Sequence, residues 1–118
     1  MSKAAYWQRG ESLDYVNETT AVIEANTIIP IEERIGIAGT SINPGEKGSL
    51  HVIGVYEIEK TGTSEIKMGA AVYFDGTGIT GAADNGKTGA EKEGYIPAGY
   101  AAQTAGAEDK AVLVKLMG

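Results

Sequence analysis

No stretch of this chain carries apolar residues at a 3.6-residue period for three helical turns, and this absence constrains the fold more than any other feature. Apolar residues instead alternate over short runs that end at turn residues, a pattern typical of strands. Seventeen of the 118 residues are glycine, which supplies the tight turns that many short strands need. We therefore predict an all-β fold, a small barrel or sandwich of short strands, with one helical turn near residues 63–67.

The first residues differ in character from the rest of the chain. Residues 1–12 are mostly polar or small, but they contain the aromatic pair Tyr6 and Trp7. Such a pair is costly to leave in water and is the residue type that anchors interfaces, so we expect it either to bind a partner or to fold back onto its own domain. The predicted organisation is an extended N-terminal arm over residues 1–12 and a single β domain over residues 13–118.

Two patterns predict how the strands are arranged. Residues 50–58 form the clearest strand. Because both of its faces are partly apolar, one face is expected in the core and the other at an interface. Residues 36–52 also resemble residues 99–114, since each segment reads as a strand, an acidic turn and a strand. This predicts two similar hairpins, which arose either by duplication or by independent reuse of a common motif.

The sequence GAADNGKT at residues 81–88 fits the nucleotide-binding pattern G-x-x-x-x-G-K-[ST]. The matching residues are Gly81, Gly86, Lys87 and Thr88. A phosphate-binding loop also needs a buried parallel strand before it and a helix directly after it. Here the preceding apolar run is too short, and Gly94 and Pro97 would end any helix within about one turn. We interpret the match as chance in an exposed loop, and we predict no cofactor.

Charge and residue types argue against several other classes of function. The net charge of −6 disfavours nucleic acid, which proteins bind mainly through Lys and Arg. The chain has no cysteine and a single histidine, His51, so no metal site is predicted. No apolar run approaches the roughly 18 residues of a membrane span, and no secretory signal is evident, so we expect no membrane partner and synthesis inside the cell. No carboxylate or serine lies in a catalytic pattern, and no enzyme activity is predicted.

Five stretches, taken in their order and spacing, resemble one known family. They are residues 6–15 (YWQRGESLDY), 35–38 (IGIA), 54–60 (GVYEIEK), 66–75 with 78–80 (IKMGAAVYFD and GIT), and 111–118 (AVLVKLMG). Over nearly its whole length the chain is similar to the capsid cement (decoration) proteins of phages. It departs from the family pattern in the long loop at residues 81–94 and at residues 99–101, which leaves the loop contacts open.

The resemblance implies a β-tulip-like domain whose role involves no catalysis. The implied function is to bind the outside of the expanded phage head and to stabilise it by bridging subunits of the major capsid protein. A homotrimer, a place on the exterior of the virion capsid and a stage in the host cytoplasm before assembly are implied as well. Within that role we predict that the arm docks on the capsid, with Tyr6, Trp7, Gln8 and Arg9 as the interface candidates.

Two other functions remain as alternatives at the level of sequence. One is a different virion subunit, such as a tail-tube or head-completion protein. The other is a small β module that binds carbohydrate or peptide through the exposed segment at residues 95–100. A nucleotide hydrolase is the least favoured function, because residues 81–88 lack the flanking strand and helix that the chemistry needs.

Overall fold

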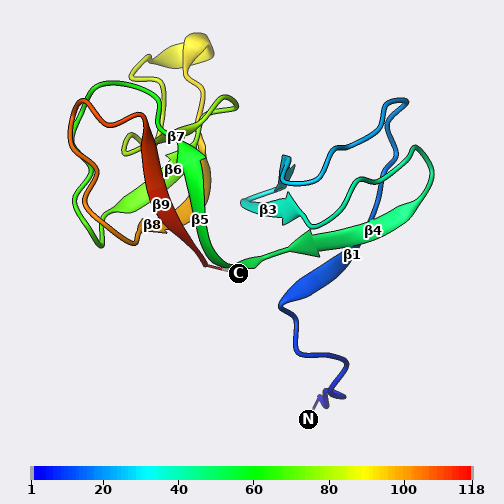
Figure 1. The fold of residues 1–118 in the computed structure, drawn as a ribbon. Coiled ribbons are helices and arrows are strands. Elements are labelled where there is room, and N and C mark those ends of the chain that lie inside the picture. The colour runs from blue at the N-terminus through cyan, green and yellow to red at the C-terminus, as the bar shows by residue number, and fades with distance from the viewer. Residues whose placement is uncertain (1, 118) are drawn as a thin grey trace.

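The computed structural model describes residues 2–117, which form two antiparallel sheets (Figure 1). The first sheet has the strand order β1-β4-β3-β2, and the second has the order β5-β9-β8-β6-β7. The elements are β1 (Ser12–Val16), β2 (Ile28–Ile31), β3 (Arg34–Ala38), β4 (Lys47–His51), β5 (Ile53–Glu59), β6 (Ala71–Phe74), β7 (Ile79–Thr80), the short 3₁₀ helix η1 (Gly89–Glu91), β8 (Ile96–Ala101) and β9 (Ala111–Met117). Because the sheets share no strand, the all-β sandwich is confirmed and the alternative of a closed barrel is wrong.

Apart from β7, the two sheets repeat one arrangement of four strands. In unit 1, formed by β1–β4, the first strand pairs with the fourth, the fourth with the third, and the third with the second. In unit 2, formed by β5, β6, β8 and β9, the strands pair in the same order. The two similar hairpins predicted from the sequence are therefore confirmed as β3–β4 and β8–β9, and the likeness extends to the strands beside them.

The pairing register is also the same in both units up to a shift between Val72 and Tyr73 in unit 2, so the rows of side chains before that shift have equivalents in both units. One row of unit 1 is Ser12, His51, Ile37 and Ile28. The equivalent row of unit 2 is Val55, Lys115, Tyr100 and Ala71. The next row, whose side chains point to the opposite face, is Leu13, Leu50 and Ala38 in unit 1 and Tyr56, Val114 and Ala101 in unit 2.

A buried polar residue follows the first strand of each unit. Asn17 follows β1 with no exposed surface, and Lys60 follows β5 with 6% exposed. The Asn17 Nδ2 donates to the carbonyls of Ala21 (2.8 Å) and Ile42 (2.9 Å). The Lys60 Nζ donates to the carbonyl of Ala107 (3.3 Å). At the same place in each unit, a buried polar side chain thus donates to the carbonyls of the loops, which gives its own polar atom a partner.

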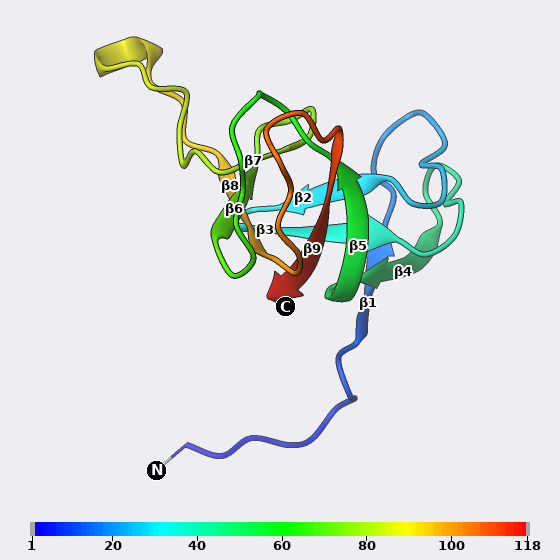
Figure 2. The same cartoon turned by 60° about the vertical axis from the view of Figure 1, so that its left-hand side comes forward.

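The two units differ mainly in one connection. Between β2 and β3 the chain turns through Glu32 and Glu33 alone. The equivalent connection, between β6 and β8, spans residues 75–95 and contains β7 and η1. In Figure 2 the outer part of this connection, drawn in yellow, projects from the body of the molecule. The segment with the nucleotide-binding pattern is therefore an insertion into the repeated unit.

Residues 50–58 are not one strand, which corrects the prediction from their alternation. β4 ends at His51, β5 begins at Ile53, and the two strands belong to different sheets. Between them the Val52 N–H donates to the Glu11 carbonyl (3.1 Å), and Gly54, near the start of β5, takes a φ of 119°. Both faces of this stretch are apolar because the chain passes from one sheet to the other within it.

The main core lies between the two units. Ile35 and Ile37 from β3 are buried in one cluster with residues of unit 2, and Ile28 packs against that cluster. The unit 2 members of the cluster include Ile58, Val72, Phe74, Val112, Val114 and Leu116. A smaller cluster, Ile29, Ala38, Leu50 and Val52, lies on the opposite face of unit 1. Unit 1 is therefore apolar on both faces, and only one of them is covered by unit 2.

The helical turn predicted near residues 63–67 is wrong. That segment of the described chain is irregular, and Ile66 forms an isolated bridge with Ala105. Each of these residues donates its N–H to the carbonyl of the other, at 2.9 and 2.8 Å. Ile23 and Ile42 form the equivalent bridge in unit 1, so pairing between the long loops outweighs local helix formation in both units.

Candidate functional site

The N-terminal arm leaves the body of the molecule and does not fold back onto it (Figure 2). Residues 2–9 are extended and exposed, and β1 begins at Ser12. Tyr6 is 81% exposed and Trp7 is 89% exposed, and neither belongs to a buried cluster. Of the two outcomes expected for this aromatic pair, packing on its own domain is therefore wrong for the single chain.

The polar side chains of the arm form hydrogen bonds and an ion pair only within the arm and with the start of β1. The Arg9 guanidinium pairs with the Glu11 carboxylate at 3.1 Å, and both side chains are more than half exposed. The Gln8 amide donates to the Ser12 carbonyl at 3.4 Å. Exposed pairs of this kind stabilise a conformation weakly. The four interface candidates thus lie together on a segment that is free to bind another surface.

The segment with the nucleotide-binding pattern does not have the surroundings of a phosphate-binding loop. It follows β7, which is two residues long and pairs antiparallel with β6. It leads into η1, a 3₁₀ helix of three residues rather than an α-helix. Lys87 is exposed. This geometry supports the interpretation of Gly81, Gly86, Lys87 and Thr88 as a chance match, which stays a prediction until nucleotide binding is measured.

Side chains within the same loop already occupy the amides that would bind a phosphate. The Gly86 N–H donates to Asp84 Oδ1 (2.8 Å), and the Lys87 N–H donates to Asn85 Oδ1 (3.1 Å). Asn85 also accepts from the Glu93 N–H (3.2 Å) and donates to the Glu91 carbonyl (2.9 Å). Asn85 therefore organises the tip of the insertion, and a carboxylate stands where an anion would have to bind.

Asp75 is the carboxylate with the most extensive set of hydrogen bonds among the described residues. Partial burial on its own would raise the Asp75 pKa, but hydrogen bonds from the Thr61 hydroxyl and from the Gly78 and Thr77 amides outweigh it and lower the pKa below 3.8. The hydroxyl lies 2.7 Å from Oδ2, and both amides lie 2.9 Å from Oδ1. Asp75 is thus an ionised acceptor that closes the β6–β7 turn, which is unsuited to proton transfer near neutral pH.

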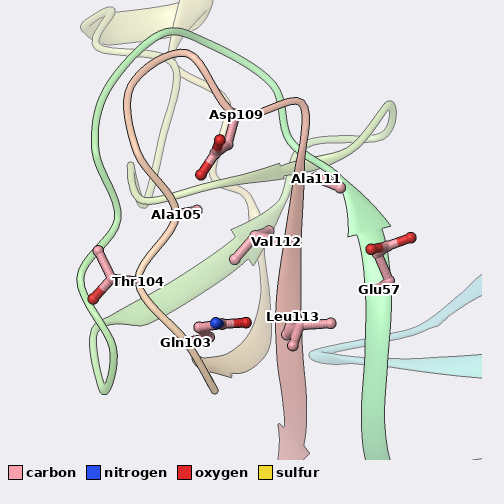
Figure 3. Close-up of a pocket in the computed structure, with 8 residues that line it drawn as sticks. All are labelled: Glu57, Gln103, Thr104, Ala105, Asp109, Ala111, Val112 and Leu113. Carbon is pink, nitrogen blue, oxygen red and sulfur yellow. The ribbon is translucent and has the colours of Figure 1, made fainter.

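The hollow in Figure 3 lies between β9 and the loop that precedes it. Its volume is about 210 Å³, which is below the roughly 300–1,000 Å³ of typical small-molecule sites. The Asp109 carboxylate in its wall accepts from the Gly106 N–H (2.7 Å), and the Thr104 hydroxyl accepts from the Met68 N–H (3.0 Å). These polar groups hold turns, and no cation lines the hollow to recognise an anion.

Within residues 2–117, no group of three or more His, Asp or Glu side chains is placed to hold a metal ion. None of the helical structure in the same range is long and apolar enough to cross a membrane. His51, the lone histidine, lies half-buried on β4 next to Gly39, where an added Cβ would meet its ring. His51 is therefore a packed strand residue.

Sequence reasoning anticipated an interface on one face of residues 50–58, but it did not locate the surface, which is the exposed face of unit 2. Val55 (53% exposed), Tyr100 (37% exposed) and the exposed Ala71 lie in one row of that sheet. In the next row outward along the strands, Ile53 and Met117 pair directly and are 40% and 66% exposed. Alternation along β5 and β9 hints at two apolar faces, but it does not reveal which face stays uncovered.

The family model described as "Phage cement protein" matches residues 7–116. The matched range begins at Trp7 in the arm. It includes β1 to β8 and all of β9 except its last residue. No curated protein and no solved structure matches the chain.

Proposed function

The chain belongs to the phage cement protein family and has a structural role associated with the phage capsid, and we propose that it binds the exterior of the expanded head and stabilises it by bridging major capsid protein subunits. The observation that carries this proposal is the extended arm, which holds two aromatic side chains in solvent at 81% and 89% exposure. Burying such side chains in a partner is favourable, because it removes their apolar surface from water, and the single chain leaves that surface exposed.

The arm is suited to pairing with a sheet edge on the capsid. Its backbone is extended up to β1, which is itself an edge strand of the first sheet. An extended segment can add a strand to an exposed edge, where main-chain hydrogen bonds give affinity and alternate side chains give specificity. In this proposal Tyr6 and Trp7 fill apolar pockets, while Gln8 and Arg9 make the polar contacts around them.

Bridging follows if several arms act together. We propose a homotrimer, whose three arms each contact a different subunit of the shell. A contact of about 4 kcal/mol gives only millimolar affinity by itself. Linking such contacts through one rigid body raises overall binding by about 100-fold or more. If the contacts exist only on the expanded shell, binding shifts the equilibrium of the head toward expansion.

The proposed activity is binding without catalysis. It is supported by the absence of a metal-binding cluster within residues 2–117 and by the engagement of Asp75 and Asp109 in turns. We also propose that the protein is made in the host cytoplasm and joins the head from outside. Nucleic acid is not proposed as a partner, because the net charge is −6. A membrane is not proposed either, because no apolar run approaches the roughly 18 residues of a membrane span.

The arm is tested by measuring copies bound per purified expanded head. We expect deletion of residues 2–9, or the double substitution Tyr6→Ala and Trp7→Ala, to lower binding by at least about 10-fold. The deletion spares Glu11, whose carbonyl accepts from Val52, so the β domain keeps its fold. The control is Val22→Ala with Met68→Ala, which truncates exposed residues of body loops at 51% and 70% exposure. Full occupancy of heads by the deleted protein contradicts the arm proposal.

The chance interpretation of GAADNGKT is tested with Lys87→Ala. Calorimetric titration with ATP and Mg²⁺ is expected to give no binding heat for the natural protein or for the variant. The variant should also bind heads as the natural protein does, because Lys87 is exposed on the inserted loop. An ATP binding heat that disappears in Lys87→Ala overturns this interpretation.

A further inference from the structure

The two repeated units pack head to tail. Each unit has two faces, which we name by one residue: the Ile37 face and the Leu50 face of unit 1, and the equivalent Tyr100 face and Val114 face of unit 2. The Ile37 face consists of Ile28, Ile35 and Ile37, and the Leu50 face of Leu13, Ala38 and Leu50. The Tyr100 face consists of Val55, Ala71 and Tyr100, and the Val114 face of Tyr56, Ala101 and Val114. Within the chain, the Ile37 face packs into the Val114 face.

Head-to-tail packing leaves one face of each kind without a partner. If the two units met through equivalent faces, the same face would be covered in unit 1 and in unit 2. Instead the Tyr100 face of unit 2 and the Leu50 face of unit 1 have no unit packed on them. Leu50 and Ala38 at the centre of the Leu50 face are already buried, at 2% and 0% exposure, so its open part is the rim around them. The Tyr100 face is the equivalent of the Ile37 face, and the Leu50 face is the equivalent of the Val114 face. The two faces without a partner are therefore equivalent to the two that pack together inside the chain. A second copy of the chain can therefore offer each of these faces the kind of surface that the equivalent face already binds within one chain.

The Tyr100 face shows what is left uncovered on unit 2. Tyr100 is 37% exposed, whereas its equivalent Ile37 is 3% exposed. Ala71 is exposed, whereas its equivalent Ile28 packs against the main core. Val55 adds a further apolar side chain at 53% exposure in the same row. The row that anchors unit 1 to its neighbour thus carries three apolar side chains in unit 2 as well, beside the half-buried Lys115, but faces solvent.

The Leu50 face shows the complementary difference on unit 1. Tyr15, Ile23 and Ile31 at its rim are only half-buried. Their equivalents by register and by loop bridge are Ile58, Ile66 and Phe74, which are 7%, 4% and 8% exposed. Leu13, the residue that starts the row, is 38% exposed. The missing burial on unit 1 corresponds to the cover that unit 2 receives from the Ile37 face.

We propose that copies of this chain associate through these two faces, the Tyr100 face of one copy packing into the Leu50 face of the next. Such a contact is heterologous, so it propagates from copy to copy and ends only when a ring closes. A ring of three copies would hold six units in the same head-to-tail relation. The contact rests on the repeat within the chain; the number three alone rests on the proposed function.

The packing inside the chain predicts which residues meet. Ile37 and Tyr56 line the same groove between the units. Their equivalents are Tyr100 and Leu13. Tyr100 of one copy should therefore lie against Leu13 of the next.

The surfaces are tested by light scattering and native mass spectrometry on the isolated full chain, without capsids. The natural protein is expected to have three times the mass of one chain, and Tyr100→Glu is expected to have the mass of one chain. Met68→Glu, at 70% exposure on a loop, is the matched control and should leave the mass unchanged. A monomeric natural protein, or a Tyr100→Glu variant that keeps the full mass, overturns the proposal.

Mixing distinguishes this contact from a symmetric one. Tyr100→Glu keeps an intact Leu50 face, and Leu13→Glu keeps an intact Tyr100 face, so each variant alone should be monomeric. Mixed, they share one good interface and should form a complex of one copy of each. If circular dichroism shows that both variants are folded and the mixture still gives monomers alone, the heterologous contact is wrong.

A cross-link tests the contact without adding charge to either face. The chain has no cysteine, so Leu13→Cys with Tyr100→Cys in one chain introduces the only thiols. Oxidation should link neighbouring copies into a covalent ring, while each single substitution should yield no species beyond a dimer. Failure of the double variant to link copies, while it retains the natural mass, contradicts the pairing of these residues. Head binding enters none of these measurements, so the result is separate from the proposed capsid role.

Discussion

The Asp75 carboxylate is a clear case in which a side chain capable of chemistry holds a turn instead. It accepts hydrogen bonds from Thr61, Thr77 and Gly78, and these lower its pKa below 3.8. Asn85 and Asp109 have similar positions in other turns. Polar residues near a Gly-rich turn therefore satisfy the backbone of this protein before they can serve a ligand.

Asp75 gives a prediction for pH dependence. Because its pKa is lower in the folded chain, the stability it adds is fully present above 3.8 and is lost as pH falls through the folded value. Asp75→Ala should lower the free energy of unfolding by about 2 kcal/mol at pH 7, and the difference should shrink below pH 3.8. Urea unfolding over this pH range measures it. Asp14→Ala is the control, because the exposed Asp14–Lys47 pair is worth less than about 1 kcal/mol.

At the scale of elements, the β8–β9 hairpin depends on the backbone of Gly99. Gly99 has a φ of +138°, and the pairing of β8 with β6 shifts register beside it. A Cβ at this position would clash with the Lys115 carbonyl of β9. The structure therefore gives the glycine at this position a steric reason.

We predict that Gly99→Ala destabilises the protein by at least about 2 kcal/mol, because both the backbone and the neighbouring strand must move. Thermal unfolding followed by circular dichroism measures the effect. Gly94→Ala is the matched control, because a Cβ there meets nothing within 4 Å, and its melting temperature should hardly change. Equal effects at the two positions would show that the β8–β9 contact does not limit stability.

At the scale of the whole molecule, the two units share one core. Ile35 and Ile37 of unit 1 are buried among residues of unit 2, at 4% and 3% exposure. Neither unit buries its apolar surface fully without the other. The repeat therefore produces a single cooperative body rather than two independent halves.

This shared core predicts the response to Ile37→Ala. The loss of free energy of unfolding should be about 2–5 kcal/mol, as for a large side chain removed from a packed core. Native-state hydrogen exchange should show a matching loss of protection at Leu50 in unit 1 and at Val114 in unit 2. Loss confined to unit 1 would mean that the units unfold separately. Val22→Ala, a truncation of a half-exposed loop residue, serves as the control.

Local patterns predicted much of the fold. The all-β class and the two similar hairpins within residues 36–52 and 99–114 follow from alternation and turn chemistry, which act over a few residues. The break at Val52 and the bridge at Ile66 were missed, because both depend on partners far along the chain. For the candidate site, the sequence singled out Tyr6 and Trp7, but their freedom from the body is a tertiary fact.

By itself the sequence determined the class of this protein: all-β, acidic, without cysteine, and similar over most of its length to phage cement proteins. These properties depend on composition and short-range pattern. Only the tertiary structure decided that the two hairpins extend into two equivalent units, and that GAADNGKT lies on an insertion into one of them. It also decided which apolar faces are buried, because burial is set by pairing between distant strands, which alternation along one strand cannot specify.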